Sequence, residues 1–317
     1  MKTKTFIVLL LLAGTCSVKA QVAKTPFSFS GTHLFINAQI GNSDTLRFIF
    51  DSGSTGAIVD SAAAEKAGVS KEGRQKVDVG GNGGTQSLLM AMNQNVRLEG
   101  GLNVTGVNPL LMDFTALSKV VGEHLDGIIG FEVLNQYVTR IDFDKKMLTF
   151  YHGIKETDTT GYTGIPFEFS KNINIARFPI SVTLTNGETF TDRVMFDLGN
   201  AGNLLISTPF SKFHDFNSKI GKNIIRGGHG VSAETQEQVA LIKSMNFNGF
   251  DFGPMVVQLT INEQAQPKDG YLGILGIGVL KRFNIIVDYA NKKIYLKPNK
   301  AYKEEFGFPK GTEELKP

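Results

Sequence analysis

The sequence predicts an all-β protein built from two copies of one structural unit, and three observations support this fold class. Glycine is abundant (35 residues), phenylalanine is common (24 residues) and tryptophan is absent, which is typical of strands joined by many turns. The apolar stretches are mostly short and are bounded by Gly, Asn or Asp, as in strands and hairpins. Three sequence landmarks recur at one constant separation, which indicates an internal duplication.

The first twenty residues have the features of a secretory signal peptide. A positive start, Met1-Lys2-Thr3-Lys4, is followed by the uncharged apolar run 6–13 and by the small-residue ending Val18-Lys19-Ala20. The run is too short to span a membrane as a helix, and no later segment approaches the roughly 18 apolar residues that a span needs. We therefore expect residues 1–20 to be removed and the mature chain to be exported (periplasm, outer envelope or secreted), with no integral membrane segment.

Cys16 leaves a second interpretation of this leader open, a bacterial lipoprotein acylated at that cysteine. The preceding residues, Ala13-Gly14-Thr15, match a lipobox poorly, so this is the weaker alternative. Cleavage after Ala20 removes the single cysteine of the chain and with it any disulfide or thiol chemistry. It also leaves 30 basic and 30 acidic residues, and a net charge near zero gives no electrostatic footprint for nucleic acid or a membrane surface.

The duplicated landmarks lie 146 residues apart. They are two aspartates that follow an apolar run and begin an Asp-x-Gly turn, two glycines that end a Gly-Ile-x-Gly segment, and two aspartates that end a strand before a Lys-Lys turn. In this order the pairs are Asp51 and Asp197, Gly130 and Gly276, and Asp142 and Asp288. The last pair is interpreted as structural, because each member begins a hairpin turn.

The domain organisation follows from the duplication. We expect an N-terminal lobe over 21–156, a polar, glycine-containing linker over 157–164, a C-terminal lobe over 165–300 and a tail over 301–317. The tail is charged and contains Pro309 and Gly311, so it is predicted to be partly loose. Helical signals are few, and short helices are predicted over 61–67, with Ser61 as its cap, over 133–136 and over 278–282.

The sequence around the first aspartate resembles the signature of the aspartic proteases. Phe48-Ile49-Phe50-Asp51-Ser52-Gly53-Ser54 is similar to their apolar–apolar–Asp–Thr/Ser–Gly–Ser/Thr motif. Gly127-Ile128-Ile129-Gly130 and Gly273-Ile274-Leu275-Gly276 resemble the hydrophobic–hydrophobic–Gly segment beside each catalytic loop. The likeness covers roughly residues 27–298, and the lobe length is nearer to retropepsin-like units joined in one chain. The resemblance implies a bilobal pepsin- or retropepsin-like fold, two β-barrel-like lobes with a cleft between them, and an aspartic endopeptidase.

Asp51 and Asp197 are the catalytic pair that this resemblance implies. Two carboxylates that face each other cannot both ionise cheaply, so they share one proton and their apparent pKa values separate. The ionised carboxylate can then take a proton from a water molecule held between them, while the protonated one polarises a peptide carbonyl. This chemistry requires neither a metal nor a cofactor, and we expect none.

The loops around the pair are predicted to support the two carboxyl groups. A glycine after each aspartate allows a sharp turn, and Ser54 is expected to donate a hydrogen bond to Asp51. The predicted supporting residues are Ser52, Gly53, Ser54, Gly199 and Asn200. The second motif departs from the family pattern at Leu198, which cannot form the bracing hydrogen bond that Ser52 offers from the first side, while the amide of Asn200 offers a donor.

A glycine-rich segment lies between the Asp-x-Gly and the Gly-Ile-x-Gly of each copy, over 79–84 and 227–230. In the family, the first of these is the flap, a hairpin that closes over an extended peptide. Gly80, Gly81 and Gly83 are therefore predicted to form a flap, although the usual flap aromatic has no match.

Other functions are weighed against proteolysis. Leu198 keeps open a module that binds a peptide or glycan without cutting it, and a purely structural envelope protein is a third alternative. No phosphate-binding loop and no Gly-x-Ser-x-Gly motif is present. The histidines fall at no metal spacing and are interpreted as surface or loop residues: His33, His124, His152, His214 and His229. With both lobes in one chain, we expect a monomer that acts on a peptide or protein substrate.

Overall fold

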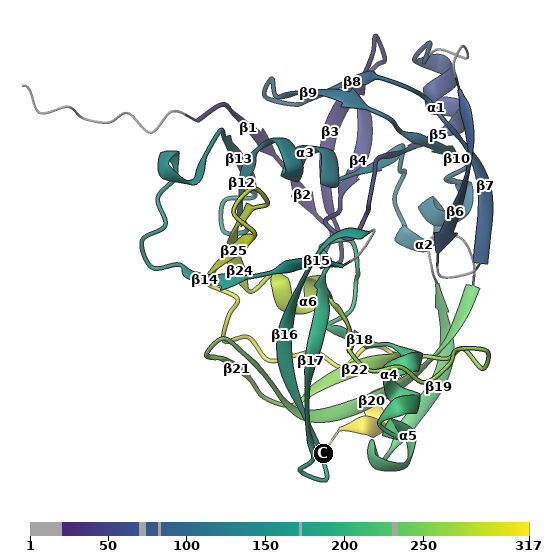
Figure 1. The fold of residues 1–317 in the computed structure, drawn as a ribbon, viewed down its shortest axis with the longest axis vertical. Helices are drawn as coiled ribbons and strands as arrows, with labels where there is room; N and C mark the ends of the chain where they lie inside the picture. The colour runs from purple at the N-terminus through teal and green to yellow at the C-terminus, as the bar shows by residue number, and fades with distance from the viewer. Residues whose placement is uncertain (1–20, 70–73, 82–83, 171–172, 230–233, 317) are drawn as a thin grey trace, which may run out of the picture.

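The computed structural model describes residues 21–69, 74–81, 84–170, 173–229 and 234–316. The predicted signal peptide, Cys16 and Gly83 of the predicted flap lie outside the described residues. The described chain forms three β-sheets with short helices between their strands (Figure 1), which confirms the predicted all-β fold of two duplicated lobes.

A central sheet joins the two halves of the chain. Its strands, in spatial order, are β1 (Ala23–Pro26), β13 (Met147–Tyr151), β12 (Val138–Asp142), β24 (Phe283–Asp288), β25 (Lys293–Pro298) and β14 (Thr163–Pro166). β12 from the first half pairs antiparallel with β24 from the second, with Thr139 opposite Val287 and Ile141 opposite Ile285. The halves are therefore connected by backbone hydrogen bonds as well as by the chain. The predicted lobe limits and linker at 157–164 stay a prediction.

The first half forms a sheet of its own, in the upper right of Figure 1. Its strands, in order, are β6 (Gln75–Gly81), β7 (Gly84–Met90), β10 (Leu110–Met112), β5 (Ile58–Asp60), β11 (Gly127–Ile129), β4 (Leu46–Phe50), β3 (Leu34–Ile40), β8 (Gln94–Leu98) and β9 (Asn103–Val107), with β2 (Ser28–Phe29) beside β3. β4 and β11 run parallel, with Phe48 opposite Gly127. Phe48 and Phe50 are fully buried, so this apolar strand lies in the core.

The second half repeats this sheet at a separation of 146 residues. Its strands, in order, are β15 (Glu168–Ser170), β16 (Ile173–Leu184), β17 (Thr189–Phe196), β23 (Gly273–Leu275), β18 (Leu204–Ile206), β22 (Met255–Thr260), β20 (Glu234–Phe247) and β19 (Asn223–His229), with β21 (Phe250–Phe252) beside β20. β17 and β23 run parallel, with Val194 opposite Gly273, as Phe48 lies opposite Gly127 in the first half. The landmarks of the repeated sequence thus occupy matching places in the two sheets.

The helices are short and connect strands. They are α1 (Ser61–Lys66), α2 (Thr115–Val121), α3 (Phe131–Gln136), α4 (Thr208–Phe213), α5 (Phe216–Lys219), α6 (Ile277–Leu280) and the 3₁₀ turns η1 (Ile154–Glu156) and η2 (Glu313–Leu315). α1, α3 and α6 lie where helices are predicted. The predicted cap of α1 is wrong, because Asp60 rather than Ser61 accepts the hydrogen bonds of the first turn, from the N–H groups of Ala62 and Ala63.

The tail is packed rather than loose, so that prediction is wrong for its described residues. Leu315 is only 4 % exposed and lies in an apolar cluster with Val239 and Val256. The buried Arg282 donates to the carbonyls of Ala301 and other tail residues and lies 3.8 Å from the centre of the Phe306 ring. The tail is charged overall, but apolar side chains spaced along it pack against the rest of the molecule. Its composition alone therefore did not indicate this packing.

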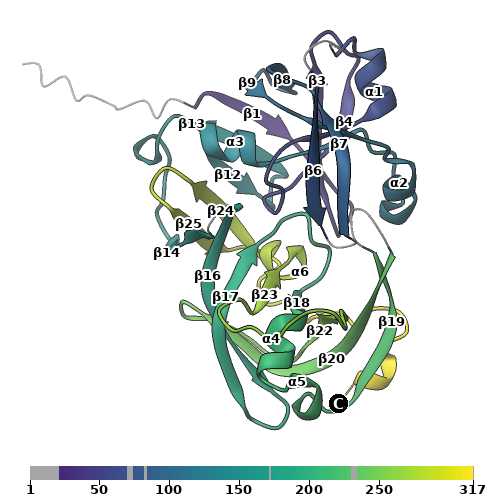
Figure 2. The same cartoon turned by 45° about the vertical axis from the view of Figure 1, so that its right-hand side comes forward.

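Two long hairpins, one from each half, extend on the same side of the molecule. In both views the described ends of β6–β7 and of β19–β20 point towards each other (Figures 1 and 2). Both hairpins are antiparallel, with Gly80 opposite Thr85 in the first and Gly227 opposite Gln236 in the second. No helix among the described residues is long and apolar enough to cross a membrane.

Candidate active site

Each of the two aspartates begins a loop directly after a buried strand. Asp51 follows β4, and its N–H donates to the carbonyl of Ile129 in β11 at 2.9 Å. Asp197 follows β17, and its N–H donates to the carbonyl of Leu275 in β23 at 3.1 Å. The aspartates are thus held in the same way by the matching strand of their own half.

The two aspartate loops pack against each other across the boundary between the halves. A Cβ placed on Gly53 would lie 2.3 Å from Cγ of Asp197, and a Cβ placed on Gly199 would lie 2.4 Å from Cγ of Asp51. Each glycine therefore lies directly against the opposing carboxyl group, at a distance that no larger residue permits. The Asp51 and Asp197 carboxyl groups therefore lie close enough for each to shift the pKa of the other. The structure thus brings together the two residues that the sequence predicts as a pair.

Backbone N–H groups of the loops point at the carboxylates. The N–H of Gly53 donates to Oδ1 of Asp51 at 2.6 Å, and the N–H groups of Gly199 and Asn200 donate to Oδ1 of Asp197 at 2.8 and 2.9 Å. These bonds fix the planes of both carboxyl groups. Because the donors belong to the backbone, this part of the geometry does not depend on the side chain that follows each aspartate.

The environment of the pair raises the pKa of both carboxyl groups. Burial raises the pKa of Asp51, although hydrogen bonds from Gly53 and Asp197 oppose the rise. Burial, the charge of Asp51 and the hydrogen bond to Asp51 together raise the pKa of Asp197 well above its ordinary value. The environment thus favours the protonated form of both groups, and the pair shares one proton.

The predicted brace exists on one side only. Ser52 is buried, and its hydroxyl donates to the carbonyl of Phe196 and accepts from the N–H of Leu198, both at 3.0 Å. Leu198 is fully buried in the apolar core instead of reaching across. One hydroxyl therefore makes both cross-loop hydrogen bonds, and the other loop is held by packing.

Two of the predicted supporting side chains act differently from the prediction. The hydroxyl of Ser54 donates to the carbonyl of Gly56 at 2.5 Å, within its own loop, and not to Asp51. The side-chain oxygen of Asn200 accepts from the N–H of Gly202 at 2.9 Å, and it is the backbone N–H of Asn200 that bonds Asp197. In both cases the side chain forms a hydrogen bond within its own turn, because serine and asparagine readily bond the backbone two residues ahead.

Glu132 is a supporting residue that the sequence reasoning missed. Its Oε1 accepts from the N–H of Ala57 at 2.6 Å, at the end of the first aspartate loop, and its Oε2 is buried with no hydrogen-bond partner. Burial raises the pKa of this carboxyl group. In the second half, Gly278 takes the place of Glu132, and the side chain of Asn203, the counterpart of Ala57, lies where a Cβ of Gly278 would be. The sequence did contain a signal for this residue, because the repeat has a glutamate at position 132 and a glycine at the matching position 278.

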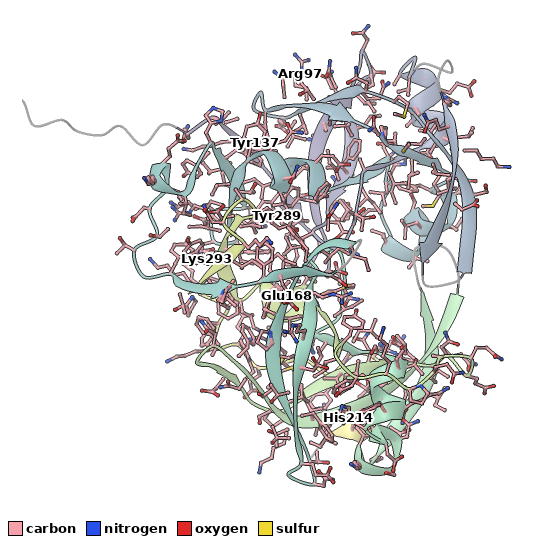
Figure 3. All side chains as sticks on the ribbon, viewed as in Figure 1. Arg97, Tyr137, Glu168, His214, Tyr289 and Lys293 are labelled. Atoms are coloured by element: carbon pink, nitrogen blue, oxygen red, sulfur yellow. The ribbon has the colours of Figure 1, made fainter. Side chains whose placement is uncertain are left out.

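Tyr289 and His33 also lie near the pair. Tyr289 packs edge-on against Phe167 and Phe169 between the halves (Figure 3), and its buried hydroxyl has no partner among the described residues. Burial and the charges of both aspartates raise its pKa. His33, predicted to be a surface or loop residue, is partly buried. Burial lowers its pKa, and a hydrogen bond with the backbone of Gly199 opposes that shift. No local pattern identifies either residue, because both contacts join segments far apart in the sequence.

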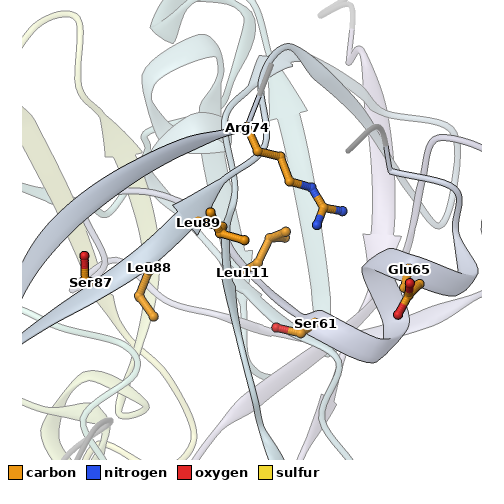
Figure 4. A pocket seen from close by; sticks show the side chains of 7 residues that line it. All are labelled: Ser61, Glu65, Arg74, Ser87, Leu88, Leu89 and Leu111. Atoms are coloured by element: carbon orange, nitrogen blue, oxygen red, sulfur yellow. The ribbon is translucent and has the colours of Figure 1, made fainter. Parts of the chain in front are cut away.

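Two of the predicted flap glycines belong to the β6–β7 hairpin, and their role as a flap stays a prediction. Gly80 and Gly81 are the last residues of β6. A pocket of about 410 Å³ lies beside this hairpin and does not include the aspartates (Figure 4); it is lined by Ser61, Glu65, Arg74, Ser87, Leu88, Leu89 and Leu111. Among the described residues, no group of three or more His, Cys, Asp or Glu side chains could hold a metal ion.

Comparison with known families agrees with the first half of the site. Residues 36–133 match the family model described as aspartyl protease. The matched segment contains Asp51 and the Gly127–Gly130 turn and ends before the second half begins. It supports an assignment to the aspartic proteases and a hydrolase activity. No curated protein matches the chain.

Proposed function

We propose that the protein is an exported aspartic endopeptidase in which Asp51 and Asp197 activate a water molecule between two lobes. The observation that supports this most strongly is the reciprocal packing of Gly53 against Asp197 and of Gly199 against Asp51. It leaves each carboxyl group against the loop that carries the other and held by backbone N–H groups. The two aspartates share one proton between themselves, so the proposal requires no other titratable side chain.

The proposed roles follow from one proton shared by two carboxyl groups. The ionised member of the pair takes a proton from the water as the water oxygen attacks the peptide carbonyl carbon. The protonated member donates a hydrogen bond to the carbonyl oxygen as negative charge develops there. The hairpin that contains Gly80 and Gly81 covers the extended peptide in this proposal, and the monomeric chain supplies both lobes.

The experiment is cleavage of a random peptide library by the purified mature chain from acid to neutral pH. We expect Asp51→Asn to abolish cleavage while leaving the circular dichroism spectrum unchanged, and statine inhibitors of the pepstatin type to compete with the substrate. Retained cleavage by Asp51→Asn would refute the proposal. Lys24→Gln, an exposed change on β1, is the matched control for handling and purity.

A second candidate is a module that holds a peptide or glycan and does not cut it. The observation in its favour is Leu198, which leaves the cross-loop brace to Ser52 alone. A loosened pair loses rate steeply, since small misplacements of catalytic groups are costly. Absence of all products from the library, together with measurable binding of a peptide or glycan, would establish this alternative.

A further inference from the structure

The second half presents a partly exposed group of side chains beside Asp197. Along β17, Met195 lies two residues before Asp197 and therefore on the same face of the sheet. Arg177 of β16 is the cross-strand partner of Met195, and Ile274 of β23 is its partner on the other side. All three side chains keep some contact with solvent, whereas Val194 and Phe196 on the opposite face are fully buried.

Tyr271 connects this group with the aspartate. The Arg177 guanidinium lies over the Tyr271 ring, 4.6 Å from its centre. Burial raises the pKa of Tyr271, the charge of Arg177 lowers it and the charge of Asp197 raises it. The register agrees with this, because Arg177 lies opposite Met195, two residues before Asp197.

No acidic side chain of the described residues pairs with the guanidinium of Arg177. Among the described residues it forms no ion pair, and its Nε is buried without a hydrogen-bond partner. Glu168, its cross-strand neighbour in β15, is paired with Arg193 instead. A buried, unsatisfied donor of a charged group is costly unless a partner completes it.

The duplication shows that this feature belongs to one side only. The positions 146 residues before Met195, Tyr271 and Ile274 are Ile49, Leu125 and Ile128. Phe35 is the counterpart of Arg177, because it lies opposite Ile49 as Arg177 lies opposite Met195. All four residues of the first half are buried in one apolar cluster next to α2. The first half therefore offers an apolar wall beside Asp51, and the second half offers a guanidinium beside Asp197.

We infer that Arg177 selects substrates with a carboxylate on the side of the scissile bond that the second half holds. Planar guanidinium groups bind carboxylates with two parallel hydrogen bonds, and Tyr271 holds this one in a fixed orientation. The substrate class is a peptide with an acidic side chain near the cleaved bond. This inference rests on the proposed peptidase function.

The test compares cleavage-site sequences of the mature wild-type chain with those of Arg177→Gln and Arg177→Glu. We expect Asp or Glu to be enriched at one position in the wild type, about tenfold or more in kcat/KM over the matching amide, as for a charged hydrogen bond. Arg177→Gln should lose this preference, and Arg177→Glu should favour Lys or Arg at that position. Arg97→Gln, an exposed change on β8 of the first half, where Arg97 donates to Gln39, is the matched control and should keep the preference.

Two further arms identify the carboxylate. Peptides with an amidated C-terminus separate a side-chain carboxylate from a terminal one, and loss of the preference below about pH 4 follows protonation of Asp and Glu side chains. Cleavage without an acidic preference, or with the same preference in all variants, would overturn the inference while leaving the peptidase intact. Absence of any cleavage by the wild type would instead refute the proposed function, and the inference with it.

Discussion

At the scale of single residues, the two aspartates are alike in backbone and different in surroundings. Both accept N–H donors from their own loops, and both lie against the glycine of the other loop. Only the first loop contributes a bracing hydroxyl, from Ser52, although the sequence repeat treats the two positions equally. Burial and the neighbouring Asp51 raise the pKa of Asp197 well above its ordinary value.

This raised pKa makes stability depend on pH in a definite direction. A carboxyl group whose folded-state pKa lies above its unfolded value stabilises the fold fully below the unfolded pKa, near 3.9 for aspartate. That contribution is lost as the pH rises through the folded-state pKa. Asp197→Asn removes the penalty and should increase the free energy of unfolding at pH 7 by about 1 kcal/mol or more.

Urea denaturation from pH 3 to pH 8 measures this effect. The gain of Asp197→Asn over wild type should vanish below about pH 4, where aspartate is protonated in both states. Asp44→Asn, at an exposed turn between β3 and β4, serves as the control and should show no such gain. A variant that is equally destabilised at every pH would show that Asp197 has only a packing role.

At the scale of elements, the Gly-Ile-x-Gly turns determine how closely the aspartate loops approach the helices behind them. Gly130 lies between β11 and α3, and a Cβ on it would lie 1.6 Å from the carbonyl oxygen of Asp51. Gly276 has the matching position, where a Cβ would lie 2.4 Å from the carbonyl oxygen of Gly202. The helices α3 and α6 can therefore pack against the loops only if glycine stands at these turns.

Gly130→Ala is the corresponding prediction. The added methyl group would overlap backbone that cannot rotate away, so the Asp51 loop must shift. We expect a loss of about 1–3 kcal/mol in the free energy of unfolding and about a hundredfold fall in kcat, measured by denaturation and by cleavage of a library-derived peptide. Gly153→Ala adds the same methyl group where nothing lies within 4 Å and should change neither quantity. Equal behaviour of the two variants would contradict the packing argument.

The elements could be predicted from the sequence wherever the signal is local. Alternation and turn residues located the strands that flank Asp51 and Asp197, and the repeat paired Gly130 with Gly276. The hydrogen-bond partner of each polar side chain could not be predicted, because several backbone groups lie within reach of residues such as Ser54 and Asp60. Contacts such as Glu132 with Ala57 join segments 75 residues apart, and no local pattern encodes them.

At the scale of the whole molecule, the central sheet explains how two copies of one unit form one body. β12 and β24 come from corresponding places in the repeat and pair with each other. Both copies therefore contribute strands to one shared sheet. The duplication predicted two equal units, but it could not reveal this pairing, because partners in a sheet are chosen by tertiary packing rather than by neighbouring sequence. Tyr289 lies beside the same sheet and packs between the halves, and the charges of both aspartates raise its pKa.

A shared sheet and a continuous core predict that the halves unfold together. One apolar cluster contains both Ile141 and Ile285, which are opposite each other in β12 and β24 and are both fully buried. Calorimetry should therefore show a single transition, and Ile285→Ala should move all of it to lower temperature, at a cost of about 2–5 kcal/mol for a truncated core side chain. Ile225→Ala, at a 64 % exposed position on β19, is the control and should leave the transition in place. Two separate transitions, only one of which moves in Ile285→Ala, would mean that the halves fold independently and that the pair of aspartates depends on docking between them.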